Sequence, residues 1–480
     1  MKTKENVEQI IAYLEDSSNF KSGKAEKVYI PEDETEVIYI LKKCAKEKIP
    51  VTISAGGTGN VAGRIPLEGV VLSTEELNRI VKIDVENKIA TLQSGVVVNN
   101  FIKELEKFNL FYPPFPTERN AFIGGNVATN ASGEYSFRFG PTRDYVRRIK
   151  MVLTTGDILE IRRGEIFEKN GFIDYEHFRI QIPSYRTPDV KCSAGYYIKE
   201  GMDAIDLIIG SEGTLGVITE VDVALIDILP ERFIMIMFFN TDDDIVEVVT
   251  RIKGYKDKLN IYSLEFFDCN SLGFLGEFEF VNRVKKNLDK NCCAIYIEAE
   301  KKNLDLWLEL AESINCIDTV VAESFSDYEK LVRLRYKLPE NINSYFKRLG
   351  TTKIAVDAAV PEGKFKELYD FYKNIMLKYK EIKMVLFGHI GENHLHFNLF
   401  PENDKQKQLA EEIYIESIRK SVSLGGTGFA EHGIGKLKSK YLYLMYGEQA
   451  IYEMAKIKKT FDPYCILGLG NIIPKEILSC

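Results

Sequence analysis

Four of the five histidines in this chain of 480 residues lie between residues 389 and 432. His394, His396 and Asn398 alternate with apolar residues, so they share one face of a predicted strand. His389 precedes a short turn, and a hairpin at that turn would fold it back towards His396. The spacing therefore predicts a polar cluster in which several imidazoles can act together.

A carboxylate and a further imidazole follow at Glu431 and His432. Imidazole nitrogen and carboxylate oxygen suit zinc, iron or manganese. The absence of nearby cysteine argues against a structural zinc site. The alternative is that the histidines only bond backbone carbonyls in the hairpin, but a group of four out of five favours metal chemistry.

Three glycine-rich segments in the first half are candidate ligand-binding loops. The first, residues 55–63, follows a predicted strand, and its glycines let backbone amides approach a ligand such as a diphosphate. A surface turn explains this cluster about equally well. The second and third span residues 123–133 and 207–219. The first two match neither the GxGxxG of nicotinamide-binding folds nor the GxxxxGK[ST] phosphate-binding loop.

The elements that position these residues change character along the chain. The first half is rich in short predicted strands without a regular strand–helix–strand repeat, and it begins with a predicted helix at 4–14. In the second half the pattern predicts strands at 233–239, 261–267 and 293–299, with helices at 243–253, 304–314, 328–338 and 404–423. The helix from 328 is expected to end at Pro339. The second half thus forms an α+β layer of its own.

Length and composition bound the class of protein. A chain of 480 residues is too long for one ordinary core, and the patterns divide it into domains at 1–230 and 231–480. With 45% hydrophobic and 28% charged residues, a globular protein is expected. The formal net charge of −8, without a basic stripe, disfavours nucleic acid as a partner.

Location and redox state follow from what the sequence lacks. It has no apolar signal core near Met1 and no run of about 18 apolar residues, so we expect no transmembrane segment and a cytoplasmic location. The eight cysteines form no CxxC motif. Neither an iron–sulfur cluster nor a disulfide framework is therefore predicted, and the thiols are expected to be reduced.

The order of the segments resembles a known family. AGGTGN, FIGGNVATNASG, FGPTRD, GSEGTLGVITEV, GHIGENHLH and AEHGIGKLK occur in this order between about Ala25 and Ile473. Together they resemble the FAD-linked oxidase family, which contains D-lactate dehydrogenase, the flavin subunit of glycolate oxidase and D-2-hydroxyglutarate dehydrogenase. The resemblance implies an α+β fold: a vanillyl-alcohol-oxidase-like FAD-binding domain of two subdomains, then a C-terminal α+β cap domain, with the C-terminal tail returning to the flavin domain.

The same resemblance assigns the glycine-rich segments to FAD. It implies that the first loop wraps the diphosphate, that the second lies along the flavin and its ribityl chain, and that the third lines the rest of the cofactor. The residues concerned are Gly56, Gly57, Thr58, Gly59, Gly124, Gly125, Thr129, Ser132, Gly133, Glu212 and Ile218. Since no histidine occurs in the first 176 residues, we expect the FAD to be bound non-covalently.

The resemblance also implies roles for the cap residues. The metal ligands are His389, His396 and Glu431, and His432 is the base that takes the proton from the substrate hydroxyl. Arg335 and Asn398 are expected to contact a 2-hydroxy acid substrate, of which D-lactate is favoured. Hydride would pass from C2 to N5 of the flavin. The same ligand set serves zinc, manganese and iron, so the metal stays open.

Three positions depart from the family pattern. Val332 stands where the family has tryptophan, His394 where it has asparagine, and Gly468-Leu469 where an Asn-Pro-Gly segment is usual. His394 is interpreted as a hydrogen-bonding substitute for the asparagine, with an extra metal ligand or an outer partner of the metal site as alternatives. Asp357 is interpreted as structural or as a partner of the metal ligands.

Electrons from the reduced flavin need an acceptor. A separate carrier such as an electron-transfer flavoprotein is favoured over oxygen, and a quinone is the other candidate; any contact with the membrane would be peripheral, through a partner. The sequence leaves a homodimer open. Competing functions are the flavin subunit of a multi-subunit glycolate oxidase, a non-redox alkylglycerone-phosphate synthase-like enzyme, and an electron-carrying flavoprotein without its own substrate.

Overall fold

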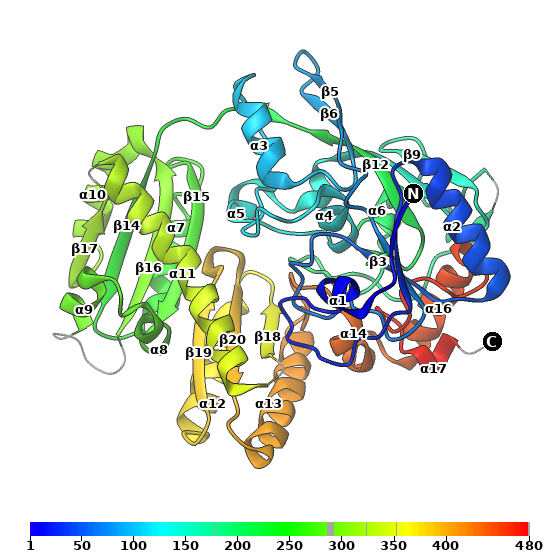
Figure 1. Ribbon diagram of the computed structural model, residues 1–480. Coiled ribbons are helices and arrows are strands. Elements are labelled where there is room, and N and C mark those ends of the chain that lie inside the picture. Colours follow the sequence, from blue (N-terminus) through cyan, green and yellow to red (C-terminus); the bar gives the residue numbers. More distant parts are fainter. Residues whose placement is uncertain (177, 286–291, 323, 352, 479–480) are drawn as a thin grey trace.

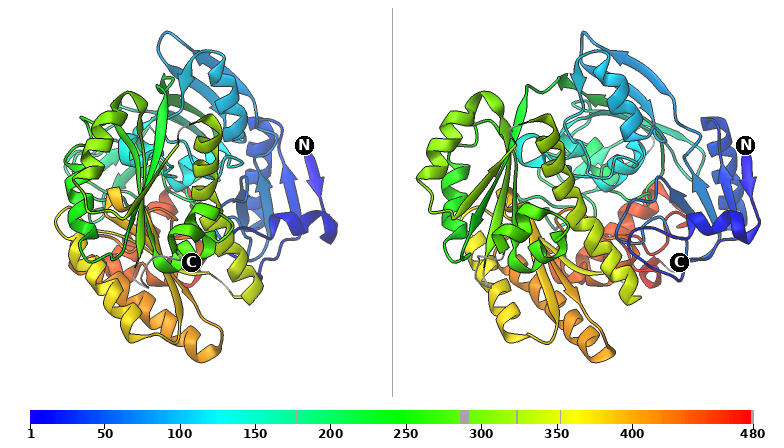
Figure 2. Two further views of the ribbon diagram at one scale, coloured as in Figure 1. Left: turned by 90° about the vertical axis from the view of Figure 1, so that its left-hand side faces the viewer. Right: turned by 60° about the vertical axis from the view of Figure 1, so that its left-hand side comes forward.

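The computed structural model describes residues 1–176, 178–285, 292–322, 324–351 and 353–478, and it mixes helices and sheets as predicted (Figure 1). The strands up to β13 (Ile226–Asp227) lie on one side of the molecule. Those from β14 (Arg232–Phe239) to β20 (His394–Phe400) lie on the other, and Figure 2 shows the two sides from further directions. The change of side thus falls within a few residues of position 230.

Two main sheets build the first half. The smaller has the order β1-β2-β4-β3, in which β2, β4 and β3 run parallel, and the larger is antiparallel with the order β5-β6-β12-β8-β9. Their strands are Lys2–Lys4 (β1), Lys27–Ile30 (β2), Val51–Ser54 (β3), Val70–Ser73 (β4), Ile80–Asp84 (β5), Ile89–Gln93 (β6), Val146–Val152 (β8), Ile158–Arg162 (β9) and Val217–Ala224 (β12). Smaller two-stranded sheets pair β7 (Leu110–Phe111) with β13, and β10 (Phe172–Asp174) with β11 (Arg179–Gln181).

Short helices connect these sheets: α1 (Val7–Ile10), α2 (Glu34–Glu47), α3 (Val98–Glu106), α4 (Ile123–Thr129), α5 (Ser136–Phe139) and α6 (Ile205–Ile208). In α2 the Asp33 side chain caps the helix by accepting a hydrogen bond from the Glu36 N–H at 2.9 Å. The helix predicted at 4–14 is shorter than expected, because β1 ends at Lys4 and the helical part, α1 with the 3₁₀ helix Ile11–Tyr13 that continues it, begins at Val7. Val7 and Ile11 of that apolar pattern are exposed, so it does not form one buried face.

A seven-stranded antiparallel sheet forms the second half, in the order β17-β14-β16-β15-β19-β20-β18. Its remaining strands are Ile261–Asp268 (β15), Cys293–Glu300 (β16), Asp318–Val321 (β17), Ile354–Ala359 (β18) and Lys383–Gly388 (β19). Because side chains alternate along a strand, Met235 and Met237 of β14 join one core while Ile234 and Ile236 join another. The sheet is therefore buried on both faces.

Helices cover both faces of this sheet. The core on the Met235 face includes residues of α7 (Ile245–Lys253), α10 (Leu304–Glu312), α12 (Phe365–Lys378) and α13 (Asp404–Ser423). The core on the Ile234 face includes residues of α8 (Cys269–Leu272), α9 (Glu279–Lys285) and α11 (Phe325–Leu349). In Figure 1, α11 runs from this sheet towards the first half of the chain.

Helix α11 is longer than predicted. We expected it to end at Pro339, but it continues to Leu349 and has proline in its interior. Proline removes one backbone hydrogen bond there, and the buried apolar residues on both sides of it, such as Leu334 and Ile342, keep the helix packed on the sheet. The extension carries Pro339 and residues up to Lys347 along a cavity wall.

The end of the chain returns to the first half. After α14 (Gly435–Lys438), α15 (Tyr443–Tyr446) and α16 (Glu448–Phe461), the Val51 N–H of β3 donates to Ile466 O at 2.8 Å. The buried Lys458 ammonium donates to Thr214 O, Leu467 O and the Asp462 carboxylate at 2.8–2.9 Å. A final short helix, α17 (Lys475–Leu478), follows. Figure 1 shows these red helices beside the blue N-terminal elements.

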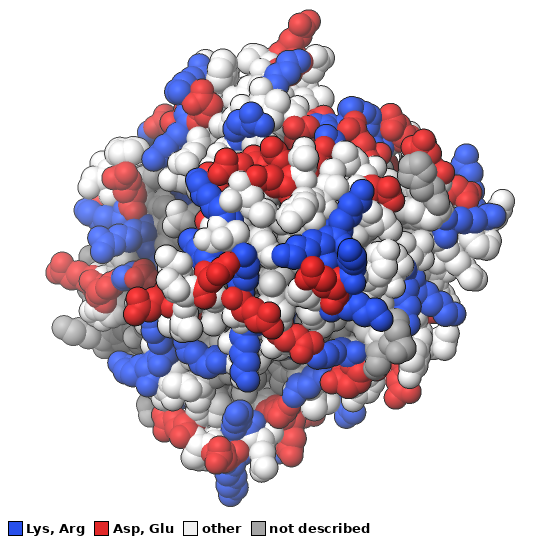
Figure 3. Space-filling model, turned by 45° about the vertical axis from the view of Figure 1, so that its right-hand side comes forward, with Lys and Arg blue, Asp and Glu red and all other residues white. Residues whose placement is uncertain are grey.

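The surface carries both signs of charge. On the face shown in Figure 3, lysine and arginine side chains are interspersed with aspartate and glutamate, and no continuous basic stripe crosses it. Within the described residues, none of the helices combines the length and apolar character needed to span a bilayer.

Candidate functional site

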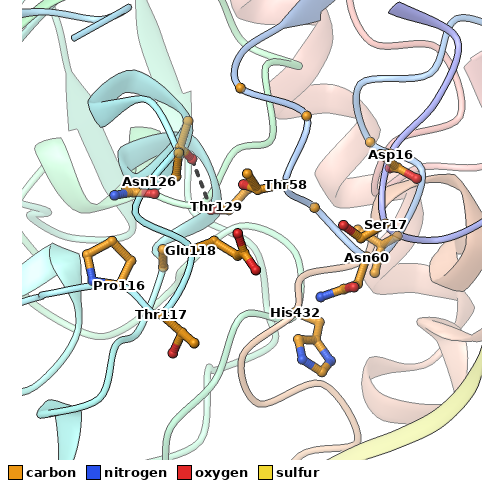
Figure 4. Close-up of a pocket in the computed structure, with 18 of the residues that line it drawn as sticks. Asp16, Ser17, Thr58, Asn60, Pro116, Thr117, Glu118, Asn126, Thr129 and His432 are labelled. Carbon is orange, nitrogen blue, oxygen red and sulfur yellow. Dashed lines mark hydrogen bonds between the residues drawn. The ribbon is translucent and has the colours of Figure 1, made fainter. Parts of the chain in front are cut away.

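A cavity of about 810 Å³ lies where the glycine-rich segments meet the cap residues. Figure 4 looks into it, with Thr58 and Asn60 from the first loop, Asn126 and Thr129 from α4, and His432 at its lower edge. Most of the residues predicted from the sequence line it: Gly56, Gly57, Thr58, Gly59, Gly124, Gly125, Thr129, Ser132, Glu212, Ile218, Arg335, His389, His396, Glu431 and His432.

Two predicted residues lie behind the cavity wall. A Cβ on Gly133 would lie 1.9 Å from Pro114 O and 2.1 Å from Phe115 O, so glycine is required there for close backbone packing. Asn398 lies in β20, fully buried, and among the described residues neither atom of its amide group has a hydrogen-bond partner. By strand alternation it faces the same way as His394 and His396.

The first glycine loop is shaped for a ligand. A Cβ at Gly59 would meet nothing within 4 Å, which leaves the backbone open to the cavity, and Gly57 has a φ of +76° that favours glycine. The Arg64 guanidinium packs against Gly57 and also lines the cavity. An open backbone with a cation beside it fits a phosphate-bearing ligand. The sequence analysis did not identify Arg64.

The predicted metal ligands converge. One ligand atom from each of His389, His396 and Glu431 lies within 4.8 Å of the others. The β19–β20 hairpin causes this, because Phe387 pairs with His396 and the chain turns after His389. Such a buried set of two imidazoles and a carboxylate fits a divalent cation.

The Glu431 carboxylate lies close to two basic side chains. Its Oε2 lies 3.2 Å from His389 Nε2 and 2.7 Å from the Lys191 ammonium. Burial alone would raise the pKa of this carboxyl, but Lys191 and His389 lower it far below its ordinary value. Lys191 also reaches Glu392 at 3.1 Å. The carboxylate is therefore ionised, as a metal ligand must be.

Asp357, fully buried in β18, organises the histidine cluster. Its Oδ1 lies 2.8 Å from His394 Nε2, and its Oδ2 accepts the main-chain N–H of His432 at 2.8 Å and of Glu431 at 3.2 Å. Oδ2 is also 3.5 Å from His432 Nδ1. His394 thus makes a hydrogen bond through one ring nitrogen, whereas its Nδ1 has no hydrogen-bond partner.

The His432 ring stacks on the His396 ring, with centroids 5.0 Å apart and an interplanar angle of 15°. Burial lowers the pKa of His432 to about 4, against the opposing effect of Asp357. Its imidazole is therefore neutral near pH 7. A second group of convergent ligand atoms comprises Asp357, His396 and His432.

Arg335 reaches the cavity from α11. Its Nη2 donates to Glu265 Oε1 at 2.7 Å, and its Nη1 lies 3.7 Å from Glu134 Oε2. The same Glu265 oxygen lies 3.0 Å from His389 Nδ1. Burial lowers the pKa of His389, but Glu265 outweighs this and raises it to about 9. One carboxylate thus ties the arginine to a predicted metal ligand.

Sequence reasoning missed some of these groups. Glu265 interrupts the mostly apolar strand β15, and a buried acid within such a strand is a usable signal. Lys353 lines the cavity, and burial lowers its pKa to about 8. Burial raises the pKa of Glu134 to about 7. Nothing in the local sequence pattern singles out Lys191.

The third glycine segment is linked to the loop that carries Glu431 and His432. Both carboxylate oxygens of Glu212 accept main-chain N–H groups, from Ile434 and Gly435, at 2.6 Å each. Burial raises the pKa of Glu212 to about 7. Glu212 therefore fixes the loop that follows Glu431 and His432.

Comparison with known proteins accounts for nearly the whole chain. Residues 25–162 match the family model described as "FAD binding domain", and residues 230–472 match "FAD linked oxidases, C-terminal domain". Solved structures agree on the fold. p-Cresol methylhydroxylase superposes with a TM-score of 0.72 at 15% identity, covering 99% of this chain and 94% of that one. An alkyldihydroxyacetonephosphate synthase gives 0.69 at 17%, covering 97% and 82%.

Curated relatives match over similar lengths. The chain is 29% identical to glycolate oxidase subunit GlcD of Bacillus subtilis, covering 97% of this chain and 93% of that protein. It is 30% identical to D-lactate dehydrogenase of Anaerostipes hadrus, over 92% and 88%. D-2-hydroxyglutarate dehydrogenase of Stutzerimonas stutzeri is 26% identical, over 97% and 95%. The predicted fold, an FAD-binding domain with a C-terminal cap, is confirmed, and the chain belongs to the family of FAD-linked oxidases, as an FAD-linked oxidoreductase.

Proposed function

We propose that this protein is an FAD-dependent dehydrogenase that oxidises a D-2-hydroxy acid, with D-lactate as the first candidate, to the 2-oxo acid. The observation that carries the proposal is the convergence of His389, His396 and Glu431 in one cavity, which His432, Arg335 and the glycine-rich segments also line. The relatives named as D-lactate and D-2-hydroxyglutarate dehydrogenases support the substrate class.

In this proposal His389, His396 and Glu431 hold a divalent ion, with zinc, manganese and iron as candidates. When bound, the ion supplies Lewis-acid chemistry that makes a hydroxyl beside it more acidic. Asp357 supports the site from behind, because it holds the main-chain N–H groups of Glu431 and His432. His394 serves this support through its hydrogen bond to Asp357, in the place where the family pattern has asparagine.

The substrate carboxylate is assigned to Arg335. Guanidinium N–H groups match two carboxylate oxygens, and within the described part of the chain the buried Nε of Arg335 has no hydrogen-bond partner. Lys353 is a second cation that lines the cavity. Asn398 stays a proposed substrate contact: it faces the same way as His396 in β20, and its amide group makes no hydrogen bond within the described residues.

His432 is assigned as the base. Its neutral imidazole accepts the hydroxyl proton through one ring nitrogen, while Nδ1 lies 3.5 Å from Asp357 Oδ2, a carboxylate that stabilises the imidazolium formed. FAD, when bound, supplies the acceptor for the hydride released from the substrate carbon. The first glycine loop and Arg64 would hold its diphosphate, and the α4 segment from Gly124 would contact the rest of the cofactor.

We expect the FAD to be bound non-covalently, because among the described residues no histidine of the glycine-rich segments lines the cavity. Acid precipitation should therefore release the yellow colour into the supernatant. A pellet that stays yellow after washing would show a covalent link and would refute this prediction.

Filling the open space at Gly59 should weaken FAD binding. A Gly59→Val side chain projects into the cavity and costs about 1–2 kcal/mol of FAD binding, which is about tenfold in affinity. Flavin fluorescence titration of the apoprotein measures it. Gly276→Ala is the control, because that exposed glycine lies outside the cavity and has only loose neighbours. Equal FAD affinity for Gly59→Val and wild type would remove the loop from the FAD site.

The decisive experiment is anaerobic reduction of the bound flavin. A panel of D- and L-2-hydroxy acids is added without air, and bleaching of the flavin absorbance by the D-acids supports the proposal. If none of the acids bleaches the flavin, the result would support the alternative, an electron-carrying flavoprotein without its own substrate. We propose that electrons leave to an electron-transfer flavoprotein or a quinone, which added acceptors would reveal by restoring the colour.

A further inference from the structure

Two cysteines 23 positions apart meet at one end of the strand pair β15–β16 in the seven-stranded sheet. Cys269 begins α8, Cys292 precedes β16, and their Sγ atoms lie 3.0 Å apart. We propose that Cys269 and Cys292 are a redox modification site that forms a reversible disulfide when the protein meets a peroxide. This inference depends neither on the proposed substrate nor on the metal site.

Strand register explains why the pair meets. In the antiparallel β15–β16 ladder, Phe267 is opposite Ala294 and Asp268 is opposite Cys293. One step further β15 gives way to α8, and this places Cys269 beside Cys292, with their Sγ atoms 3.0 Å apart. Closing the bond requires the sulfur atoms to approach by about 1 Å, which side-chain rotation can supply.

The pair is accessible from one side. Cys269 is half-buried and forms part of the wall of a second cavity of about 620 Å³, whereas Cys292 is 2% exposed. The same cavity is lined by Arg348 and Lys383. Because Cys269 borders this cavity and Cys292 is buried, Cys269 is the thiol that a peroxide reaches first, and Cys292 is the thiol that resolves it.

The chemistry balances with a peroxide as the oxidant. The Cys269 thiolate attacks one peroxide oxygen, the O–O bond breaks, and protonation of the leaving oxygen gives water and a sulfenic acid. Cys292 sulfur then attacks the Cys269 sulfur, the S–O bond breaks, and the departing hydroxide takes the Cys292 proton as a second water. Two thiols are oxidised by two electrons in total, and one hydrogen peroxide is reduced to two waters.

The bond would close a loop that supports the candidate site. The segment between the two cysteines contains α8 and α9, and it packs on α11, which carries Arg335 to the cavity (Figure 1). Cross-linking the ends of such a segment restricts its unfolded states and stabilises it. We therefore expect the oxidised protein to melt at a higher temperature and to exchange amide hydrogens more slowly in 269–285.

Peptide mapping tests the inference on the FAD-loaded protein. After treatment with hydrogen peroxide and alkylation of the remaining thiols, mass spectrometry without reduction should find the Cys269 and Cys292 peptides linked. The thiol count in denaturant should fall from eight to six, and dithiothreitol should restore it. Cys292→Ser should abolish the link, whereas Cys293→Ser, at the neighbouring buried cysteine, should keep it.

Three results would overturn the inference: an unchanged thiol count, a link between other cysteines, or Cys269 oxidised to sulfinic acid while Cys292 remains alkylated as a thiol. The mapping of the wild-type protein needs no variant, so it stays informative if Cys292→Ser fails to fold.

Discussion

Replacing His432 by alanine should lower kcat for the hydroxy acid about 10²–10⁴-fold, because a positioned general base contributes a factor of that size. The protein should stay folded and yellow, since His432 lies on the cap side of the cavity and the glycine-rich segments do not depend on its side chain. Stopped-flow measurement of flavin reduction under nitrogen isolates the step concerned.

The metal content decides how the His432→Ala result is interpreted. The variant should bind metal with an affinity within a few-fold of wild type, because the proposed ligand atoms belong to His389, His396 and Glu431. A His389→Ala variant is the matched comparison and should lose both metal and turnover. Turnover at the wild-type rate in His432→Ala would end its assignment as the base, and loss of metal would reassign it as a ligand.

Replacing Glu265 by glutamine should weaken metal binding about 10–100-fold, the usual cost of losing a carboxylate that orients a ligating histidine. The Glu265 oxygen 3.0 Å from His389 Nδ1 fixes the ring so that Nε2 faces Glu431. Competition with a chromophoric chelator measures the affinity. Excess metal should restore much of the activity, because the ligands themselves are intact.

Glu298→Gln provides the control for Glu265→Gln. Glu298 is equally buried in the neighbouring strand β16, but its carboxylate binds Tyr135, Tyr328 and Arg232 and not the histidine cluster. It should reduce stability in urea and leave metal affinity unchanged. Equal metal loss in both variants would mean that the effect comes from general disturbance of the sheet.

Local pattern predicted the histidine hairpin well, for a physical reason. The two-residue period of a strand places His394 and His396 on one face from sequence alone, and the turn before them brings His389 alongside. The order of the glycine-rich segments predicted the fold, and the comparisons confirm that prediction. Where residues that are neighbours in space are also near in the sequence, periodicity is enough to predict their contact.

Other features depend on contacts between distant residues. Glu265 meets Arg335 across 70 positions, and no local pattern pairs them. Helix α11 continues through Pro339 because packing of Leu334 and Ile342 outweighs one lost hydrogen bond, which propensity alone does not reveal. The N-terminal helix is shorter than its apolar pattern predicts, because Val7 and Ile11 are exposed while Ile10 is buried.

The most direct test is the rate of anaerobic flavin reduction by D-lactate, or by the most reactive D-2-hydroxy acid of the panel, measured before and after the metal is removed by a chelator. The account predicts that the chelated protein keeps its FAD, is reduced at least a hundredfold more slowly, about the lower limit of what activation of the hydroxyl contributes, and recovers when the metal is returned. Reduction at an unchanged rate in protein shown to be metal-free would contradict it.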